Sequence, residues 1–318
     1  MKILLVTPAQ RSRKGNWITA ARWRRILRRL GHQAIIQQRY EGETCDVLIA
    51  LHALKSFDAI ERFHREHPGR ALIVTQTGTD LYRDIRRSDD AQRAMRWADR
   101  MIVLQPEGLS ELTPELRAKT RVIRQSATPT RARVAKSRLH FDVCVVGHLR
   151  PVKDPFRCAQ AAAMLPPTSR LRVLQAGAAL SPEMADQARA EMARNRRYRW
   201  LDDLPRWKVK QLMARCQAMV LSSHMEGGAN VVSEAIVAGL PVLSTRIPGS
   251  IGMLGENHRG YFATGDTEGL AELLQQCETQ PDFLQHLADC SRRRAYLFEP
   301  AREEGAWVDL LAELAVSS

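Results

Sequence analysis

The stretch AMVLSSHMEGGANVVSEAIVAGLPVLST, residues 218–245, decides the fold. Its first residues, 218–222, form an apolar run typical of a buried strand, and a loop of small residues follows. A helix is predicted from about Asn230, and a second strand at 241–244 follows Gly239. Strand, helix and strand in this order form the βαβ unit that joins two parallel strands. The stretch therefore predicts a parallel sheet whose faces are covered by helices.

The same alternation extends outward over most of the chain, where short runs rich in Val, Ile and Leu are separated by segments of helical period. The first series of strand-like runs comprises 2–7, 46–51, 71–75, 101–104 and, more weakly, 120–124. The second series comprises 141–146, 171–175, 218–222 and 241–244. Strands that alternate with helices in this way predict an α/β protein with two doubly wound parallel sheets.

A segment without apolar periodicity, 126–140, separates the two series and is interpreted as a linker. We therefore expect an N-terminal Rossmann-like domain at 1–135 and a C-terminal one at 136–290. The remainder, 291–318, is predicted to form helices that Pro300 interrupts and that could pack back on the first domain. Ligands of open α/β sheets bind outside the carboxyl ends of the strands, so the residues that follow each strand are the candidates for a site.

Composition limits the class of protein. The chain has 318 residues, of which 44% are hydrophobic, and no apolar run approaches the roughly 18 residues of a membrane span. The beginning, MKILLVTPA, is too short for a signal peptide, so we expect a cytoplasmic protein. The six cysteines show no C-x-x-C spacing, and several, such as Cys144, lie in apolar runs. They are predicted to be reduced core residues, and neither zinc ligands nor disulfides.

The charge of the chain is strongly positive, with a net charge of +13 and a pI of about 10.0. Such a charge is compatible with a nucleic-acid partner. The arginines are, however, spread along the whole chain, without a basic tail and without interleaved aromatic residues. An anionic small-molecule substrate explains the charge as well, and we do not expect nucleic acid to be a partner.

Two carboxylates in the stretch 218–245 are candidates for substrate binding. Glu226 lies in the predicted loop and Glu234 in about the first turn of the predicted helix, so both can face a cleft between the domains. The glycines at 227 and 228 let a ligand approach the backbone closely, and the amides of 228–232 at the helix start form an anion site. In the alternative interpretation, Glu234 only complements the helix dipole and Glu226 is a surface residue.

This stretch resembles the E-x7-E signature of family 4 glycosyltransferases, which have the GT-B fold of two Rossmann-like domains facing across a cleft. The matching positions are Glu226, Gly227, Glu234, Ala235, Gly239, Pro241 and Val242. The resemblance implies that Glu234 holds the ribose of a nucleotide and that Glu226 contacts the donor sugar and takes part in catalysis. It places the loop and helix start at the donor as well: Gly227, Gly228, Ala229, Asn230 and Val231. No D-x-D motif occurs, so neither a metal nor another cofactor is expected.

A second motif, VVGHLRPVKD at 145–154, follows the strand-like run 141–146. It resembles the G-R-L-x-x-x-K-G sequence with which the family holds the donor diphosphate, and Gly147, Leu149 and Lys153 match it. The family arginine is replaced by His148, while Arg150 stands two residues further on. Two cations would stabilise the charge of a leaving diphosphate. Whether His148 or Arg150 supplies the second one stays open, and Lys153 could instead be merely solvated.

The loops of the first domain are candidates for the acceptor side. The loop PAQRSRKGN, at 8–16, carries a strongly cationic cluster before a predicted helix, at the place of the family's Gly-rich loop. Its candidate residues are Arg11, Arg13, Lys14, Gly15 and Asn16. A basic surface loop without function is the alternative.

Another candidate segment is TQTGTDLYRD, at 75–84, which partly matches a family pattern H-G-x-D through Gly78 and Asp80. Asp80, with its neighbour Thr79, could contact the acceptor or the sugar, and Asp80 could equally be a helix N-cap. In the second domain, His224 stands two residues before Glu226 and could touch the donor sugar, although a structural role is the alternative.

Three longer strings, MKILLVTPAQRSRKGNWITAARW, LIVTQTGTDLYRDI and EGGANVVSEA, are similar to the selenosugar synthases of selenoneine biosynthesis. This resemblance implies UDP-N-acetylglucosamine or UDP-glucose as donor and selenophosphate as acceptor, with a 1-seleno sugar as product after loss of phosphate. The alternatives are a family 4 enzyme with a carbohydrate or lipid acceptor at a membrane surface, and a non-catalytic binder of nucleotide sugars or nucleic acid. The donor preference, the anomeric configuration and the oligomeric state stay open.

Overall fold

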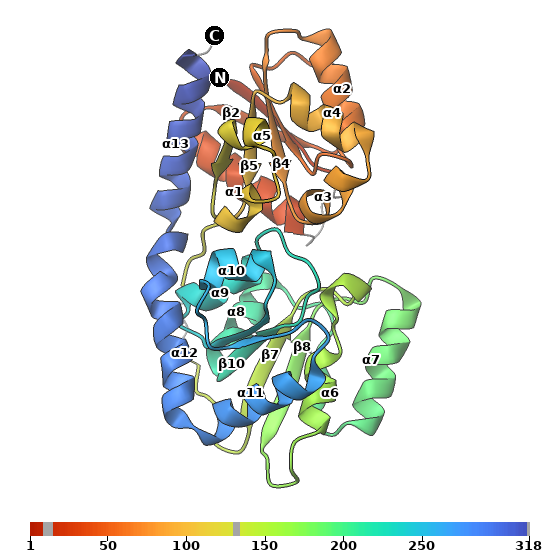
Figure 1. The fold of residues 1–318 in the computed structure, drawn as a ribbon, viewed down its shortest axis with the longest axis vertical. Coiled ribbons are helices and arrows are strands. Elements are labelled where there is room, and N and C mark those ends of the chain that lie inside the picture. Colours follow the sequence, from red (N-terminus) through yellow and green to blue (C-terminus); the bar gives the residue numbers. More distant parts are fainter. Residues whose placement is uncertain (9–14, 130–133, 317–318) are drawn as a thin grey trace. The chain divides into compact units, whose positions relative to one another are not determined.

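The computed structural model describes residues 1–8, 15–129 and 134–316 (Figure 1). The chain divides into two compact units, each built around its own parallel sheet. The first unit contains Met1–Gln125, Glu226–Gly228 and Pro300–Ser318. The second unit contains Ser126–Met225 and Ala229–Glu299. Each unit is described below by itself.

The first unit holds a six-stranded parallel sheet in the order β2-β1-β3-β4-β5-β6. Its strands are β1 (Lys2–Val6), β2 (Gln33–Gln37), β3 (Val47–Leu51), β4 (Ala71–Gln76), β5 (Arg100–Val103) and β6 (Thr120–Val122). In β1, Leu4 pairs with Ile35 on one side and with Leu48 on the other. From β1, the chain first adds β2 on one side of the sheet, and it then adds β3 to β6 in succession on the other side. The switch point, where ligands of such sheets bind, therefore lies between β1 and β3.

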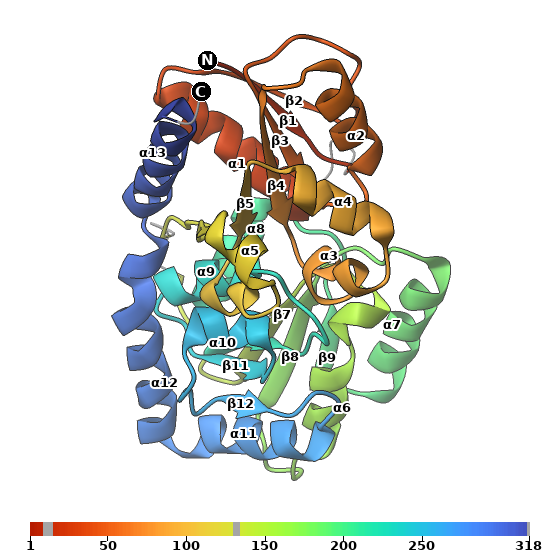
Figure 2. The same cartoon turned by 45° about the horizontal axis from the view of Figure 1, so that its top comes forward.

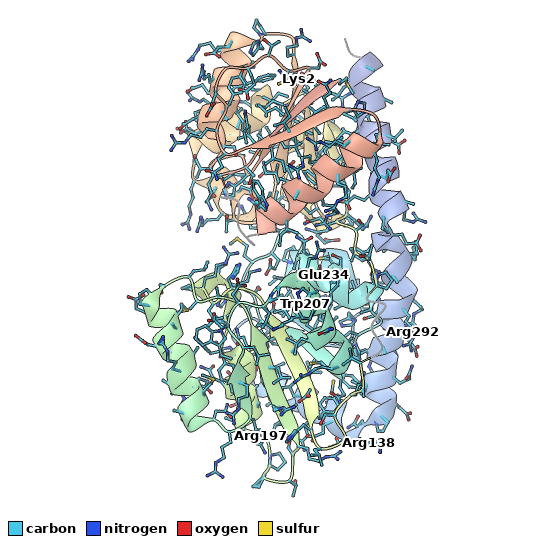
Figure 3. The ribbon with its side chains drawn as sticks, turned by 180° about the vertical axis from the view of Figure 1, so that it is seen from behind. Lys2, Arg138, Arg197, Trp207, Glu234 and Arg292 are labelled. Carbon is cyan, nitrogen blue, oxygen red and sulfur yellow. The ribbon has the colours of Figure 1, made fainter. Side chains whose placement is uncertain are left out.

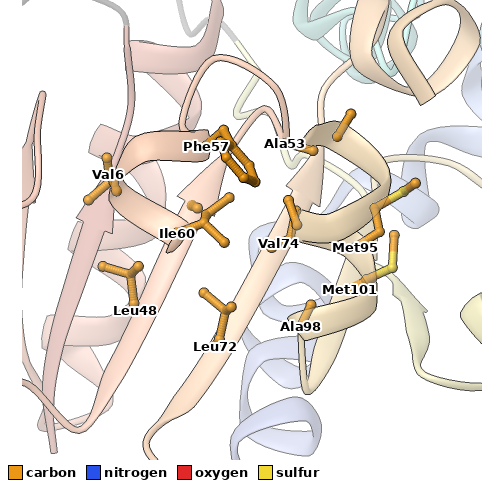
Figure 4. Packing of buried hydrophobic residues seen from close by; sticks show 14 of the residues in the cluster. Val6, Leu48, Ala53, Phe57, Ile60, Leu72, Val74, Met95, Ala98 and Met101 are labelled. Atoms are coloured by element: carbon orange, nitrogen blue, oxygen red, sulfur yellow. The ribbon is translucent and has the colours of Figure 1, made fainter. Parts of the chain in front are cut away.

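Helices cover both faces of this sheet. They are α1 (Gly15–Arg29), α2 (Phe57–Glu66), α3 (Thr79–Tyr82), α4 (Asp89–Trp97), α5 (Pro114–Ala118) and α13 (Pro300–Val316), with short 3₁₀ helices η1 (Asp84–Arg86) and η2 (Pro106–Leu109). On one face, Phe57 and Ile60 of α2 and Met95 of α4 pack on Leu48 and Leu72 (Figure 4). On this face of the sheet, the apolar sides of the helices and strands thus form one hydrophobic core.

The other face of the first sheet is covered by α1 and α13, which are almost three hundred residues apart in the sequence. The rings of Trp23 and Trp307 meet edge to face with centroids 4.9 Å apart. The buried Trp23 indole donates a hydrogen bond of 2.8 Å to Glu303 Oε1. Pro300 is the first residue of α13, a position where proline suits a helix because no partner for its N–H is needed.

The second unit holds another six-stranded parallel sheet, in the order β12-β11-β10-β7-β8-β9. Its strands are β7 (Phe141–Val146), β8 (Leu171–Ala176), β9 (Tyr198–Trp200), β10 (Ala218–Leu221), β11 (Val242–Thr245) and β12 (Tyr261–Phe262). Counted from β7, this is the strand order of dinucleotide-binding domains, and its switch point lies between β7 and β10. The predicted pair of doubly wound parallel sheets is therefore confirmed.

Helices also cover both faces of the second sheet (Figure 2). They are α6 (Arg157–Ala163), α7 (Pro182–Arg194), α8 (Arg206–Arg215), α9 (Asn230–Val237), α10 (Pro248–Leu254), α11 (Thr267–Thr279) and α12 (Pro281–Arg294), with the 3₁₀ helices η3 (Pro151–Lys153) and η4 (Ala295–Phe298). Residues of α6, α11 and α12 form the core on one face, and residues of α8, α9 and α10 form the core on the other. Five of the six cysteines are buried, as expected, whereas Cys290 is partly exposed.

Three strands were not predicted: β2, β9 and β12. β2 and β9 end their sheets on one side, and β12 ends the second sheet on the other. β2 alternates between exposed and buried residues at its start, and β9 and β12 contain only three and two residues. An apolar run marks a strand that is buried on both faces, so a short or half-exposed edge strand lacks that signal.

In the described part of the chain, no helix combines the length and the apolar character that a membrane crossing requires.

Candidate functional site

The loops that follow β7 and β10 meet at the switch point of the second sheet. The His224 amide donates to the Val152 carbonyl over 2.9 Å. The Ser222 hydroxyl donates to the carbonyls of Asp154 and Lys153, at 2.8 and 3.2 Å. Two motifs that lie some seventy residues apart in the chain are thereby held together by three hydrogen bonds.

The loop after β7 also packs against the loop after β8. The Gly147 amide donates to the Ala176 carbonyl over 2.9 Å, and a Cβ at Gly177 would lie 2.0 Å from Gly147 O. Gly177 has a φ of +151°, which other residues rarely adopt. Sequence reasoning missed this residue. The available signal was a glycine two residues after the predicted strand 171–175.

We expect Gly177→Ala to lower the free energy of unfolding by about 1–3 kcal/mol, because the added methyl group cannot fit without moving the loop that starts at Gly147. Urea unfolding measures this change. The control is Gly305→Ala in α13, where a Cβ meets nothing within 4 Å and a helical alanine is favoured. Equal stability of the Gly177→Ala and wild-type proteins would show that the loop yields without cost.

His148 is anchored in a defined tautomer. Its Nδ1 accepts a hydrogen bond of 3.2 Å from the Ala178 amide, so the neutral ring carries its proton on Nε2. Arg150 is exposed at the N-cap of η3, and Lys153 is the partly exposed last residue of that helix. The loop therefore presents an imidazole N–H donor and two cationic side chains. Which of them replaces the family arginine stays a prediction.

Glu234 is the fifth residue of α9 and so lies just beyond the first turn, and the predicted helix start at Asn230 is confirmed. Its Oε1 accepts a hydrogen bond of 2.8 Å from the guanidinium of Arg206, the first residue of α8. Figure 3 marks Glu234 and Trp207, the neighbour of Arg206. Sequence reasoning missed Arg206, because no motif spacing connects α8 with α9.

The start of α9 offers fewer free amides than predicted. Ala229 is the N-cap and is buried, its side chain makes no capping hydrogen bond, and Asn230 and Val231 are the first two helical residues. The Val232 amide donates to the Ala229 carbonyl over 2.9 Å. The expectation that all amides of 228–232 point outward is therefore wrong, since the first turn of the helix already uses the one at Val232.

The loop Glu226–Gly228 clusters with the first unit. A Cβ at Gly227 would lie 2.4 Å from the Thr77 carbonyl oxygen, and one at Gly228 would lie 2.6 Å from Leu104 Cβ. Packing against the chain itself thus requires both glycines, while contact with a ligand stays a prediction. Glu226 is 9% exposed. Its charge contributes to the raised pKa of Tyr82, which is caused mainly by burial of the phenol.

On the acceptor side, Arg11, Arg13 and Lys14 lie outside the described residues. Gly15 and Asn16 are the first residues of α1. The Asn16 side-chain amide donates to Thr77 Oγ1 over 3.3 Å, which connects the start of α1 with the loop that follows β4. Within the first unit, the two segments predicted to hold the acceptor are therefore adjacent.

Asp80 is fully buried and holds the loop after β4 in place. Its carboxylate accepts the amides of Thr77 at 2.8 Å and Gly78 at 2.7 Å, and a longer bond of 3.3 Å comes from Ala53. The N-cap of α3 is Gly78 and not Asp80, so the predicted N-cap position is wrong. Asp80 reaches back from inside the first turn to the amides that precede it. A contact of Asp80 with the acceptor stays a prediction.

His52, which sequence reasoning missed, lies directly after β3 with a φ of +79°, an unusual conformation for a residue with a side chain. It is buried, and its Nδ1 accepts from the Lys55 amide at 3.3 Å. Its Nε2 lies 3.1 Å from the hydroxyl of Thr79, the first residue of α3. Burial lowers the pKa of His52 despite the nearby carboxylates of Asp80 and Asp84. A neutral His52 therefore donates to the partly exposed Thr79 hydroxyl.

Burial likewise lowers the pKa of His258, whose Nε2 lies 2.8 Å from the Val242 carbonyl oxygen. In the unfolded chain, His52 and His258 become protonated near pH 6.5, the ordinary pKa of histidine. In the folded chain, both become protonated only at lower pH. Stability should therefore fall as the pH drops below about 6.5, by up to about 1.4 kcal/mol per pH unit for each histidine. Urea unfolding at pH 7.5 and 5.5 measures this loss. His258→Gln should show a smaller loss, and identical pH dependence in both proteins would contradict the assignment.

Comparison with known proteins identifies the family. A family model described as "Glycosyl transferases group 1" matches residues 130–294. The D-inositol 3-phosphate glycosyltransferase of Corynebacterium efficiens is 29% identical in an alignment of 196 positions, which covers 57% of this chain and 44% of that protein. The chain thus spans less than half the length of that relative. The Glycosyltransferase 1 domain-containing protein 1 of Xenopus tropicalis is 23% identical in an alignment of 328 positions including gaps, which covers 92% of both chains.

Solved structures show the same fold. Anabaena Alr3699/HepE in complex with UDP and glucose matches with a TM-score of 0.78 at 17% identity, over 98% of this chain and 100% of that chain. Sucrose-phosphate synthase (tll1590) from Thermosynechococcus elongatus matches with a TM-score of 0.79 at 15% identity, over the full length of both chains. The predicted GT-B fold is thereby confirmed. Since the family model covers more than half of the 318 residues, the chain belongs to group 1 of the glycosyl transferases.

Proposed function

We propose that the protein transfers a sugar from UDP-glucose or UDP-N-acetylglucosamine to selenophosphate and forms a 1-seleno sugar. The observation that carries the donor half is the junction of the β7 and β10 loops at the switch point of the second sheet. Three hydrogen bonds there connect the segment Gly147–Asp154 with Ser222 and His224. A sheet of this strand order binds nucleotides at that place.

Each part of the donor has a proposed partner. The diphosphate lies against Lys153, with His148 or Arg150 as the second donor of positive charge or of a hydrogen bond. Glu234 binds the ribose, and Glu226 binds the sugar. The loop and helix start Gly227–Val231 and the exposed side chain of His224 line the donor. A relative in fold, HepE, has been solved with UDP and glucose, which supports a UDP-sugar as the donor here.

The chemistry needs charge stabilisation more than proton transfer. The bond from C1 of the sugar to the diphosphate breaks, and its electron pair leaves with UDP. Lys153, together with the Nε2–H of His148 or the guanidinium of Arg150, stabilises that growing charge. The anionic selenium of selenophosphate forms the C1–Se bond and needs no general base. Attack of water on phosphorus then breaks the Se–P bond, which releases phosphate and leaves the 1-seleno sugar.

The acceptor is placed on the first unit. Selenophosphate is a small polyanion, and the loop with Arg11, Arg13 and Lys14 supplies cations for it. Gly15, Asn16, Thr79 and Asp80 complete the proposed acceptor residues. The bond from Asn16 to Thr77 supports this grouping, because it joins the two segments that contain them.

A second candidate acceptor is a phosphorylated polyol. The relative from Corynebacterium efficiens is named for D-inositol 3-phosphate. The phosphate group of that compound, like selenophosphate, is an anion that cationic side chains can bind. A cationic loop would suit either acceptor, so only turnover separates the two.

The deciding experiment incubates the purified protein with UDP-glucose or UDP-N-acetylglucosamine and one acceptor at a time: selenophosphate, inositol 3-phosphate or none. UDP release is measured, and the product is identified by mass spectrometry. We expect a selenium-containing sugar and fast UDP release when selenophosphate is the acceptor, and neither with inositol 3-phosphate or without an acceptor. UDP release only with inositol 3-phosphate would favour the second candidate, and no UDP release with any acceptor would refute both.

A further inference from the structure

We propose that Arg206 is a second ligand of the donor ribose and that it acts with Glu234 as a matched pair that selects ribonucleotides over 2′-deoxyribonucleotides. This inference rests on the proposed function and adds to it a residue and a specificity. It starts from the contact that joins the first residue of α8 to the fifth residue of α9.

The two side chains of the Arg206–Glu234 pair differ in their exposure to solvent. The Glu234 side chain is 11% exposed, whereas the Arg206 side chain is 51% exposed. Its guanidinium has five N–H donors, and in the described part of the chain its one hydrogen bond is the 2.8 Å bond to Glu234 Oε1. Arg206 therefore orients the carboxylate and still has donors that face solvent. An incoming ligand can use those donors.

The position of Arg206 is unfavourable for the helix that carries it. α8 has no acidic residue in its first turn, and its N-cap, Pro205, provides no side-chain hydrogen bond. A cation at a helix N-terminus opposes the helix dipole, so Arg206 does not serve the stability of α8. The pair with Glu234 is largely solvated on the arginine side, and such pairs contribute little to stability. Neither effect explains a cation at this position.

A second cation lies beside the pair. Lys210, one turn further along α8, donates to the carbonyl and the hydroxyl of Thr128 at 2.9 and 3.0 Å. Burial lowers the pKa of Lys210, and the charge of Arg206 lowers it further, while Glu234 opposes the shift. The charges of Arg206 and Glu234 both act on Lys210, and the excess positive charge of these three groups suits an anionic ligand. Because Lys210 is already bound to Thr128, Arg206 is the cation that can turn to the ligand.

A ribose diol fits this arrangement chemically. Each hydroxyl can donate one hydrogen bond and accept another. The carboxylate of Glu234 accepts, and the guanidinium of Arg206 donates, so the pair satisfies both functions of the diol. A 2′-deoxy ligand leaves one of these charged groups without its partner inside the complex. Sites built to bind a hydroxyl discriminate strongly against ligands that lack it, for this reason.

The test is calorimetric binding of UDP and 2′-deoxy-UDP, which needs no acceptor. We expect wild-type protein to prefer UDP, and Arg206→Gln to weaken UDP binding about tenfold, the effect of one charge-assisted hydrogen bond. Arg206→Gln should affect 2′-deoxy-UDP much less, so the preference shrinks. In a double-mutant cycle with Glu234→Gln, the two losses should not add, because the residues contact each other.

The matched control is Arg189→Gln. Arg189 forms a bond of similar length, 2.7 Å, with Asp186 on α7, and both side chains are exposed. This variant should bind both nucleotides as the wild type does, and thermal unfolding checks that each variant is folded. If Arg206→Gln keeps the wild-type affinities for both nucleotides, the inference is refuted while the proposed function stands. If the wild-type protein does not bind UDP, the proposed function fails first and the inference falls with it.

Discussion

Lys153→Ala should lower the rate constant of sugar transfer by about 10²- to 10³-fold, the usual loss when a group that stabilises transition-state charge is removed. The side chain lies at the end of η3, at the switch point of the second sheet. Its ammonium is proposed to face the diphosphate, whose charge grows as the bond to C1 breaks. An interaction that strengthens in the transition state appears in kcat more than in substrate affinity.

The backbone hydrogen bonds of residue 153 should remain in Lys153→Ala. Its carbonyl accepts from the Ser222 hydroxyl at 3.2 Å, and its amide donates to the Arg150 carbonyl at 2.9 Å. Neither bond involves the side chain. Both backbone bonds remain possible in Lys153→Ala, and we expect the loss of rate to report the missing charge.

UDP release from UDP-sugar in the presence of selenophosphate measures the rate. The control is Lys2→Ala, which removes the same charge from the start of β1 in the first unit (Figure 3). We expect Lys2→Ala to turn over as the wild type does. A Lys153→Ala protein with a wild-type kcat would show that the diphosphate is not bound by the β7 loop.

The second large effect is expected for Glu234→Ala, which should weaken UDP binding about 10- to 100-fold, the loss of a charged hydrogen bond. Glu234 is largely buried, and within the described residues its one hydrogen-bond partner is the half-exposed Arg206. After the substitution, the guanidinium can turn to water, so no buried charge is left alone. We therefore expect the free energy of unfolding to change by less than about 1 kcal/mol.

Titration calorimetry with UDP measures the affinity, and urea unfolding measures the stability. Glu256→Ala is the control, because Glu256 is an exposed carboxylate of the second unit that is paired with Arg246. It should leave UDP affinity unchanged. Wild-type affinity in Glu234→Ala would mean that the ribose binds elsewhere, and a large loss of stability would mean that Glu234 is a structural residue.

The sequence by itself determined the class of fold and the two motifs of the second unit. Central parallel strands are buried on both faces, so they must be continuous apolar runs, and β1, β3, β4, β5, β7, β8, β10 and β11 were visible for that reason. The motif after β7 and the loop after β10 were visible because backbone geometry and phosphate binding restrict residue types at fixed spacings. The edge strands β2, β9 and β12 carry neither constraint, and they were missed.

Only the tertiary structure decided which residues support those motifs. Arg206 and Glu234 are 28 positions apart, and His52 and Thr79 are 27 positions apart. Gly177 meets the Gly147 carbonyl across two neighbouring strands. The last two pairs meet because they follow strands that are neighbours in a sheet, whereas Arg206 and Glu234 meet because α8 and α9 pack in the same core on one face of the second sheet. Local spacing does not encode this arrangement, since it results from how all helices and strands of a unit bury their apolar faces at once.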